Sequence, residues 1–181
     1  MAFRFGPLLT SVGSLRMDFT DILLAPASNP YDVNSWNTFF NLPTNGSVFT
    51  SVRVSGNTVY LYGGSNITLS SNLFEGAKIT NIQDTLSCIV SIGLNCFDTS
   101  LLIVASLPAV TTIGDYCFTS CYNIISYYLP SLTTTGIYAF QKNTILPSIN
   151  LPSATYIGAH CFDQCESLQT IDLRACTNLG G

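Results

Sequence analysis

The stretch that decides the fold runs from Gly114 to Cys121 and reads GDYCFTSC. A similar eight-residue stretch, GAHCFDQC, occurs at 158–165, so the sequence contains a repeat. Similar residues recur in columns: a phenylalanine every 21 or 22 residues, a glycine four residues before it, and a leucine column between. These columns are Phe97, Phe118, Phe140 and Phe162; Gly93, Gly114, Gly136 and Gly158; and Leu86, Leu107, Leu129, Leu151 and Leu173. A fixed period of this length predicts units that stack on their own copies.

Each unit also carries a Leu-x-x-Ile-x-Leu pattern, seen best at Leu168, Ile171 and Leu173. This spacing predicts a bend that leads into a short strand, with alternate residues pointing inward. We expect one strand per unit, a backbone turn at the glycine, and a short helical or 3₁₀ segment that begins at the phenylalanine. One unit cannot bury its own apolar face, whereas stacked units can. The fold class predicted is therefore an α/β repeat solenoid with a short parallel β-sheet.

This pattern resembles the BspA-like leucine-rich repeats, whose units read approximately I-G-x-x-A-F-x-x-C-x-x-L-x-x-I-x-L-P. The resemblance covers residues 86–181, and the last unit is incomplete. The positions of one unit that fit are Ile157, Gly158, Cys161, Phe162, Cys165, Leu168, Ile171 and Leu173. The first unit is a residue short and has Ser100 near the place of the second cysteine, and the third unit has Asn143 there. The resemblance implies leucine-rich repeats and a protein that binds others at a cell surface.

Two further segments precede the repeats. Residues 30–85 are predicted to form a small, mainly β N-terminal cap: a hairpin around Ser55–Thr58, a third strand at Ile67–Leu69, and a short helix that Asp32 caps and Pro43 ends. Trp36 lies on the apolar face of that helix and is expected in the core. Residues 1–29 are expected to be an arm or linker through which the protein could dock on other subunits.

Composition limits the classes of function. Only 9% of residues are charged, the net charge is −4, and no segment concentrates Lys or Arg, so nucleic acid is not an expected partner. No apolar run is long enough for a membrane span, and no signal peptide is apparent. Leu179 and Gly180 begin a further unit, so we expect that the parent gene encodes more residues; the alternative is that a partner subunit covers this end.

The chain offers little chemistry. A zinc site could be assembled from the Cys117–Cys121 and Cys161–Cys165 pairs with His160, but the pairs lie two units apart, about 10 Å at strand spacing, so no metal is expected. The cysteines are expected to be buried apolar side chains, although a Cys96–Cys117 disulfide stays open, as does the redox compartment. His160 is the only histidine and should point outward. No enzyme activity and no cofactor are expected.

The remaining candidate for a functional site is the exposed surface of the repeats. On each predicted strand the outward residues form a ladder, which we call the strand face: Val104, Ser106, Ser126, Tyr128, Ser148, Asn150, Thr170 and Asp172. Such a polar surface with one aromatic ring suits recognition of a protein or a glycan. The alternative is that the hydroxyl groups only keep an exposed sheet in solution.

The function predicted is a non-enzymatic binding or structural protein, with a phage virion as the expected location. There it would be a tail- or head-associated component that binds a host surface protein or glycan, with residues 1–29 contacting other virion subunits. The alternative is an extracellular or cell-surface bacterial adhesin. A eukaryotic surface protein is a third interpretation, with Asn45 and Asn66 as glycan acceptors.

Overall fold

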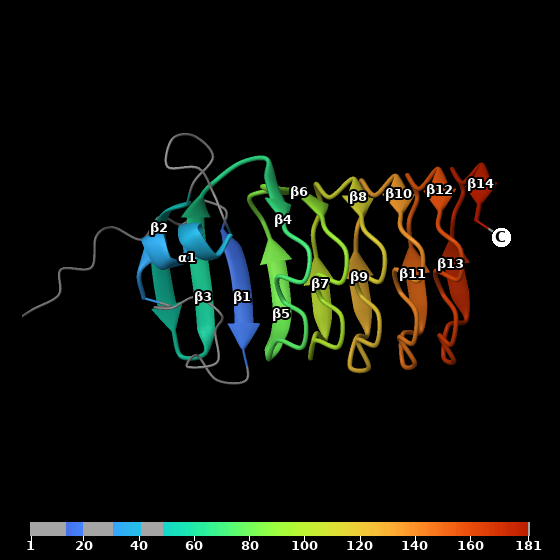
Figure 1. Ribbon diagram of the computed structural model, residues 1–181, viewed down its shortest axis with the longest axis horizontal. Helices are drawn as coiled ribbons and strands as arrows, with labels where there is room; N and C mark the ends of the chain where they lie inside the picture. Colours follow the sequence, from blue (N-terminus) through green and yellow to red (C-terminus); the bar gives the residue numbers. More distant parts are fainter. Residues whose placement is uncertain (1–13, 20–30, 41–48, 181) are drawn as a thin grey trace, which may run out of the picture.

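The computed structural model describes residues 14–19, 31–40 and 49–180, and these form a straight stack of coils with a small antiparallel unit at one end (Figure 1). Its elements are β1 (Leu15–Phe19), α1 (Val33–Phe39), β2 (Phe49–Ser55), β3 (Thr58–Gly63), β4 (Ile67–Leu69), β5 (Ile79–Asp84), β6 (Ile89–Ile92), β7 (Val104–Ser106), β8 (Thr112–Ile113), β9 (Ser126–Tyr128), β10 (Thr134–Thr135), β11 (Ser148–Asn150), β12 (Tyr156–Ile157), β13 (Thr170–Asp172) and β14 (Asn178–Leu179). The predicted repeat solenoid is confirmed.

Each coil contributes two strands, and the expectation of one strand was wrong. The second strand of each coil lies in a sheet that includes the N-terminal strands, ordered β2-β3-β1-β5-β7-β9, or in a two-stranded sheet of β11 and β13. The first strands of the coils form another sheet, ordered β14-β12-β10-β8-β6-β4, whose pairs are all parallel. Strands such as Thr112–Ile113 are only two residues long, too short for the alternation that reveals a strand in sequence.

The third side of each coil consists of turns, and the expected helical or 3₁₀ segment is not formed in the described coils. Two residues in each turn segment adopt left-handed backbone conformations, as at Tyr116 (φ 55°) and Ser120 (φ 56°). A helix requires consecutive right-handed residues, so these two positions exclude one. The carbonyl and amide groups bond to the neighbouring coil instead, as from Phe118 N to Ala139 O (2.8 Å).

The glycines recur at a regular spacing, but the reason is not the backbone turn that we expected. Gly114, Gly136 and Gly158 are not among the residues with positive φ, so none is needed for a left-handed turn. A Cβ on Gly114 would instead lie 2.6 Å from Leu94 N, and one on Gly158 would overlap the carbonyl of Gly136. The glycine column therefore lets the backbones of successive coils pass close to one another.

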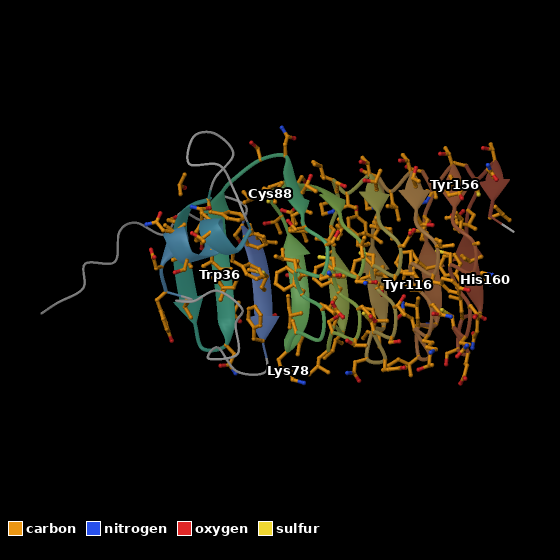
Figure 2. The ribbon with its side chains drawn as sticks, viewed as in Figure 1. Trp36, Lys78, Cys88, Tyr116, Tyr156 and His160 are labelled. Carbon is orange, nitrogen blue, oxygen red and sulfur yellow. The ribbon has the colours of Figure 1, made fainter. Side chains whose placement is uncertain are left out.

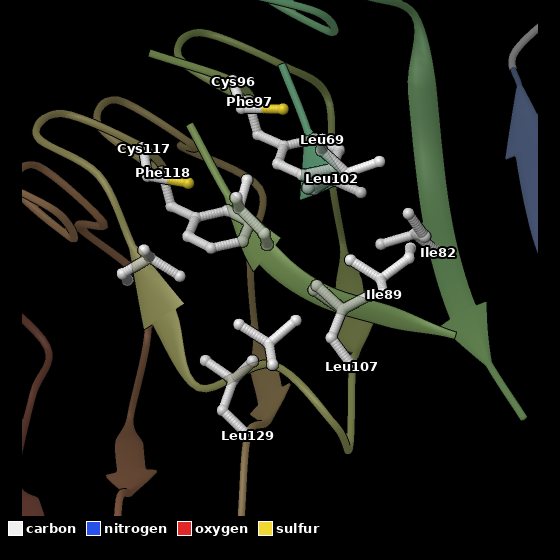
Figure 3. Close-up of a cluster of buried hydrophobic side chains, with 14 of the residues drawn as sticks. Leu69, Ile82, Ile89, Cys96, Phe97, Leu102, Leu107, Cys117, Phe118 and Leu129 are labelled. Atoms are coloured by element: carbon white, nitrogen blue, oxygen red, sulfur yellow. The ribbon is translucent and has the colours of Figure 1, made fainter. Parts of the chain in front are cut away.

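The core is a file of stacked phenylalanines between the two sheets. The rings of Phe97 and Phe118, and of Phe118 and Phe140, are nearly parallel with centroids 5.1 and 5.7 Å apart, and Phe162 continues the file at 5.5 Å. Buried leucines and isoleucines from both sheets surround the rings, as the close-up in Figure 3 shows. The single interior file that the period predicts is confirmed.

The file begins one coil earlier than the boundary at residue 86. Phe74 is fully buried and stacks on Phe97 at 5.1 Å, and β4 and β5 pair in parallel with β6 and β7. This first coil lacks the sequence signature, since Ser70 stands four residues before Phe74 where the later coils have glycine, and Leu73 stands where they have cysteine or alanine. Residues 65–85 therefore belong structurally with the coils, although the sequence analysis assigned them to the cap.

The N-terminal unit closes one end of the file. The hairpin of β2 and β3 and the Asp32-capped α1 form as predicted, and Trp36 is fully buried against Phe19 and Phe40. The helix ends at Phe39; Pro43 lies outside the described residues. Ile67–Leu69 is a strand, as expected, but it pairs with β6 and not with the hairpin.

Residues 15–19 do not form part of an arm, which corrects the assignment of 1–29 for this segment. They form β1, which pairs antiparallel with both β3 and β5 and buries Leu15, Met17 and Phe19. This strand joins the antiparallel unit to the coils, and its partners lie 40 or more residues away in sequence. Residues 1–13 and 20–30 lie outside the described part of the chain. In the described part, no helix is long and apolar enough to cross a membrane.

Candidate binding face

The structure brings the eight residues of the strand face onto one outer surface. Backbone register places Val104 beside Ser126 and Ser106 beside Tyr128, and likewise Ser148 beside Thr170 and Asn150 beside Asp172. The residues between them are buried on the first three strands, at Ala105, Tyr127 and Ile149, whereas Ile171 of the last coil is 42% exposed. The ladder therefore consists of two columns of side chains. They follow β7, β9, β11 and β13, which lie side by side along the axis of the stack (Figure 1).

Exposure differs along the two columns. Tyr128 is 58% exposed and is the one aromatic ring of the strand face. The serines of β9 and β11, Asn150 and Thr170 are also exposed, whereas Val104, Ser106 and Asp172 are half-buried. The face thus offers hydroxyl and amide groups and one phenol to a partner.

The sheet beneath the face is interrupted between β9 and β11. The amides of Ile103, Ile125 and Gln169 each donate to the preceding coil, at 2.8 to 3.0 Å. Pro147 occupies the equivalent position before β11 and has no amide hydrogen, so this ladder bond cannot form there. Among the described strands, β11 accordingly pairs only with β13, and the face has a seam between Tyr128 and Asn150.

Asp172, at the last coil, is not a free carboxylate. Its side chain accepts hydrogen bonds from the guanidinium and the backbone amide of Arg174. These bonds lower the pKa of Asp172 below its ordinary value. The negative charge of Asp172 on the strand face is therefore neutralised by Arg174, two residues later.

The polar surface continues past β7 into residues that the sequence analysis missed. Asn81 and Gln83 of β5 lie in register with Val104 and Ser106. Beyond them, Asp18 accepts hydrogen bonds from Arg16 (2.8 Å), Thr58 (2.6 Å) and Asn81 (2.9 Å). The alternation of LRMDF could have suggested a strand, but nothing in the sequence says that it lies between β3 and β5. The face therefore extends over the antiparallel unit.

Cys96, Cys117, Cys121 and Cys161 are buried thiols that belong to the core. All seven cysteines are free, including Cys96 and Cys117, so the disulfide left open above is not formed in this structure. Burial raises the pKa of Cys96 and Cys121 to about 12 and that of Cys161 to about 11, and Cys117 is raised as well. These side chains are neutral thiols in the core at ordinary pH.

The other titratable groups do not gather into a site either. His160, which Figure 2 labels near the C-terminal end of the stack, is exposed, as expected. Its ring stacks on that of Tyr138 with centroids 4.9 Å apart. Burial and the nearby Glu75 raise the pKa of Asp98. Within residues 14–19, 31–40 and 49–180, no group of three or more His, Cys, Asp or Glu side chains could hold a metal ion.

Fold and surface together define a repeat protein whose parallel strands stack into a solenoid with an exposed polar face. Residues 65–180 match six copies of the BspA type leucine-rich repeat region, which is more than half of the chain. The chain belongs to this family. The match also begins where the stacked coils begin, close to β4.

A solved structure supports the same conclusion. The chain is similar to a leucine-rich repeat protein from Bacteroides ovatus ATCC 8483, with 30% identity and a TM-score of 0.55. The similarity covers 68% of this chain and 32% of the Bacteroides protein, so the chain spans about a third of that protein's length. No curated protein matches the sequence.

Proposed function

We propose that the protein is a non-enzymatic binding protein that recognises a protein or a glycan through the strand face. The observation that carries this proposal is the register of the eight outward side chains, which on β7, β9 and β11 flank the buried residues Ala105, Tyr127 and Ile149. The core positions maintain the coil, so the outward positions are free to specify a partner. Hydroxyl and amide groups with one exposed tyrosine provide hydrogen bonds and ring stacking.

The setting that we propose first is a phage virion, in which the protein is a tail- or head-associated component that attaches to a host. Low charge and the combination of a cap with repeats support this setting. In this setting, the residues of 1–29 that lie outside β1 would contact other virion subunits. The strand β1 is excluded because it pairs with β3 and β5 in the sheet.

A bacterial cell-surface or secreted adhesin is the second candidate. The likeness to a leucine-rich repeat protein of Bacteroides ovatus favours it. Both settings use the same face for the same purpose, and they differ in the particle or cell that carries the protein. Neighbouring genes separate them: capsid, portal or tail genes support the virion, and genes for export or surface anchoring support the adhesin.

The binding role is tested by a double substitution on the strand face, Tyr128→Ala with Asn150→Ala. The matched control is Tyr156→Ala with Asn178→Ala, because this pair has the same chemistry and lies in register on the outer side of the other sheet. The labelled protein is applied to a panel of intact bacterial cells and to a glycan array. We expect the strand-face variant to lose at least about tenfold in binding, which corresponds to about 1.4 kcal/mol, and the control to bind as before. Equal binding by the two variants would remove the strand face as the site.

A further inference from the structure

A single row of outward side chains crosses six neighbouring strands, from the antiparallel unit into the coils. Backbone register pairs these residues strand by strand, and we call them the arginine row: Arg53, Tyr60, Arg16, Gln83, Ser106 and Tyr128. The six strands lie side by side in Figure 1, in the order β2-β3-β1-β5-β7-β9. At about 4.8 Å between neighbouring strands, the row is about 24 Å long.

The arginine row lies on the outer surface of this sheet. Both sequence neighbours of Arg16 and of Tyr60 are fully buried in the core: Leu15, Met17, Val59 and Leu61. Arg53 and Tyr128, at the two ends of the row, are exposed, and the four residues between them are half-buried. A ligand can therefore reach the whole row from solution.

Arg16 is held in place by Asp18, two residues later on the same strand. The Asp18 carboxylate accepts from Nε and Nη2 of Arg16 at 3.1 and 2.8 Å, and it also accepts hydrogen bonds from Thr58 and Asn81. Because the guanidinium is a rigid planar fork, this pairing fixes the direction of Nη1, which lies outside the ion pair. The Arg16 side chain is 38% exposed and that of Asp18 only 18%, so a ligand meets the guanidinium first.

The second arginine, Arg53, lies on the other side of Tyr60. Its guanidinium carbon is 5.8 Å from the centre of the Tyr60 ring, and in the described part of the chain Arg53 forms no ion pair. Tyr60 is in register with both arginines, so one phenol ring stands between two guanidinium groups. Such a set suits a ligand that combines a ring with carboxylates, because guanidinium groups bind carboxylates through paired hydrogen bonds.

The charge of this surface differs from that of the whole chain. The chain has ten acidic and six basic residues and a net charge of −4. Within the six strands, the charged residues that are exposed or half-buried are two arginines and Asp18, since Asp84 is buried. The single carboxylate is already paired with Arg16, so one positive charge remains in excess, at Arg53. The surface therefore favours an anionic ligand.

The middle of a sheet does not favour an extended peptide. A peptide that adds to a sheet needs a free strand edge, and β3, β1, β5 and β7 are each paired on both sides. A ligand of the row meets side chains alone: two phenols, two guanidinium groups, an amide and a hydroxyl. These groups match the sugar rings, hydroxyl groups and carboxylates of an acidic glycan that lies flat across the strands.

We propose that the arginine row binds a linear glycan that carries carboxylate groups. A carboxylate pairs with the guanidinium groups beside Tyr60, and the sugar chain runs across β5 and β7 toward Tyr128. This inference rests on the proposed function, because Ser106 and Tyr128 belong to the strand face. It adds the chemical class of the ligand and extends the site onto the antiparallel unit.

The test uses the full chain and two linear carboxylate glycans, polygalacturonate and polysialic acid, each beside its own methyl ester. The ester keeps the sugar chain and removes the charge. The parent protein should bind at least one acid form about tenfold or more tightly than its ester, as expected for a charge-assisted pair. This preference should shrink as added salt screens the charges. Polyglutamate, which carries carboxylates on a peptide backbone, is the third probe and should bind much more weakly than the preferred glycan.

The row variant is Arg53→Gln with Arg16→Gln. It removes both guanidinium groups, while Asp18 keeps its hydrogen bonds from Thr58 and Asn81. The single variant Arg53→Gln, at an exposed position outside any described ion pair, keeps the test decisive if the double variant does not fold. Circular dichroism verifies the fold of each variant.

The matched control is Lys78→Gln with Lys142→Gln, which removes the same amount of charge away from the row. Lys78 is exposed and lies at the lower end of β5 (Figure 2). Gln164 occupies the position of Lys142 one coil later, and both residues have a left-handed backbone, with φ of 56° and 59°. The control therefore keeps the coil and tests whether net charge alone attracts the glycan.

We expect the row variant to bind acid and ester within about twofold of each other, and the control to keep the preference of the parent. Arg53→Gln alone should lower that preference at least about threefold. The proposal is overturned if the parent binds neither glycan or binds acid and ester equally, if row variant and control lose equally, or if polyglutamate binds as tightly as the glycans. The strand-face variant, Tyr128→Ala with Asn150→Ala, should bind acid and ester more weakly alike, so its cell binding decides the proposed function separately.

Discussion

The ring of Phe118 lies on the ring of Phe97 with centroids 5.1 Å apart and planes within 3° of parallel. The two residues are 21 positions apart in sequence, so equivalent residues of adjacent repeats pack directly on each other. Phe140 covers the other side of Phe118 in the same manner. A middle ring of the file therefore holds three coils together.

Replacing Phe118 by alanine should destabilise the protein more than any exposed aromatic substitution. The ring is fully buried, and its removal leaves a cavity between two neighbouring rings that the backbone ladders keep apart. Buried Phe→Ala changes cost about 3–5 kcal/mol. Urea unfolding measures the loss, and Tyr122→Ala, at a 52% exposed ring, should stay within about 0.5 kcal/mol of the parent. Similar losses for the two variants would mean that the file does not hold the coils together.

Gly158→Ala should be much more damaging than Gly56→Ala. An alanine Cβ at 158 overlaps the carbonyl of Gly136 in the preceding coil, and backbone on both sides cannot move without separating the coils. At Gly56 nothing lies within 4 Å, and only the left-handed backbone (φ +57°) opposes a side chain, which costs about 1–2 kcal/mol. Thermal unfolding followed by circular dichroism compares the two. An equal fall in melting temperature would contradict close approach as the role of the glycine column.

The period could be recognised from sequence because inward side chains recur in the same columns, and a core of stacked rings tolerates little variation. Phe97 to Phe162 and the strand face are therefore predictable. The first coil is not, because Ser70 and Leu73 replace the glycine and the cysteine of the signature. The place of β1 is not predictable either, since its pairing with β3 and β5 depends on residues 40 or more positions away.

The direction of side chains at the bends could not be predicted either. A sequence pattern alone assigns apolar residues to a core. Ile125 follows Ile124 directly, yet Ile124 is fully buried and Ile125 is 49% exposed. The direction of each side chain at a bend depends on the local backbone and not on a simple period of two.

Stability should fall in alkaline solution because the folded protein keeps its thiols neutral. The ordinary thiol pKa of 9.0 is raised to about 12 for Cys96 and Cys121, chiefly by burial. Unfolding therefore releases protons above about pH 9, so the contribution of the neutral thiols is complete below that pH and is lost as pH rises toward about 12. Urea midpoints across this window measure the slope.

The control for this prediction is Cys117→Ala, which copies Ala139 in the same column and removes one buried thiol. Burial raises the pKa of Cys117 well above 9.0, so its removal should make the alkaline decline shallower. A decline as steep as that of the parent would assign the effect to other groups, such as the tyrosines.

The last prediction concerns a polar pair inside the core, Asn143 and Tyr127. Two other coils have cysteine in place of Asn143, and these thiols donate to backbone oxygens: Cys121 to Phe97 O (3.2 Å) and Cys165 to Phe140 O (3.1 Å). Asn143 is fully buried and donates Nδ2 to the hydroxyl of Tyr127 (2.9 Å), and its Oδ1 has no hydrogen-bond partner. Tyr127 thus compensates for the asparagine in the cysteine column.

Tyr127→Phe alone should cost about 1–3 kcal/mol, because it leaves the buried amide donor of Asn143 without its acceptor. Adding Asn143→Cys should recover most of that loss, since a thiol there can donate to the backbone as Cys121 and Cys165 do. Asn143→Cys alone should be destabilising to a smaller extent, because the Tyr127 hydroxyl then loses its partner. Urea unfolding of the four proteins completes a double-mutant cycle. Additive losses, with no recovery in the double variant, would show that the two side chains are not coupled.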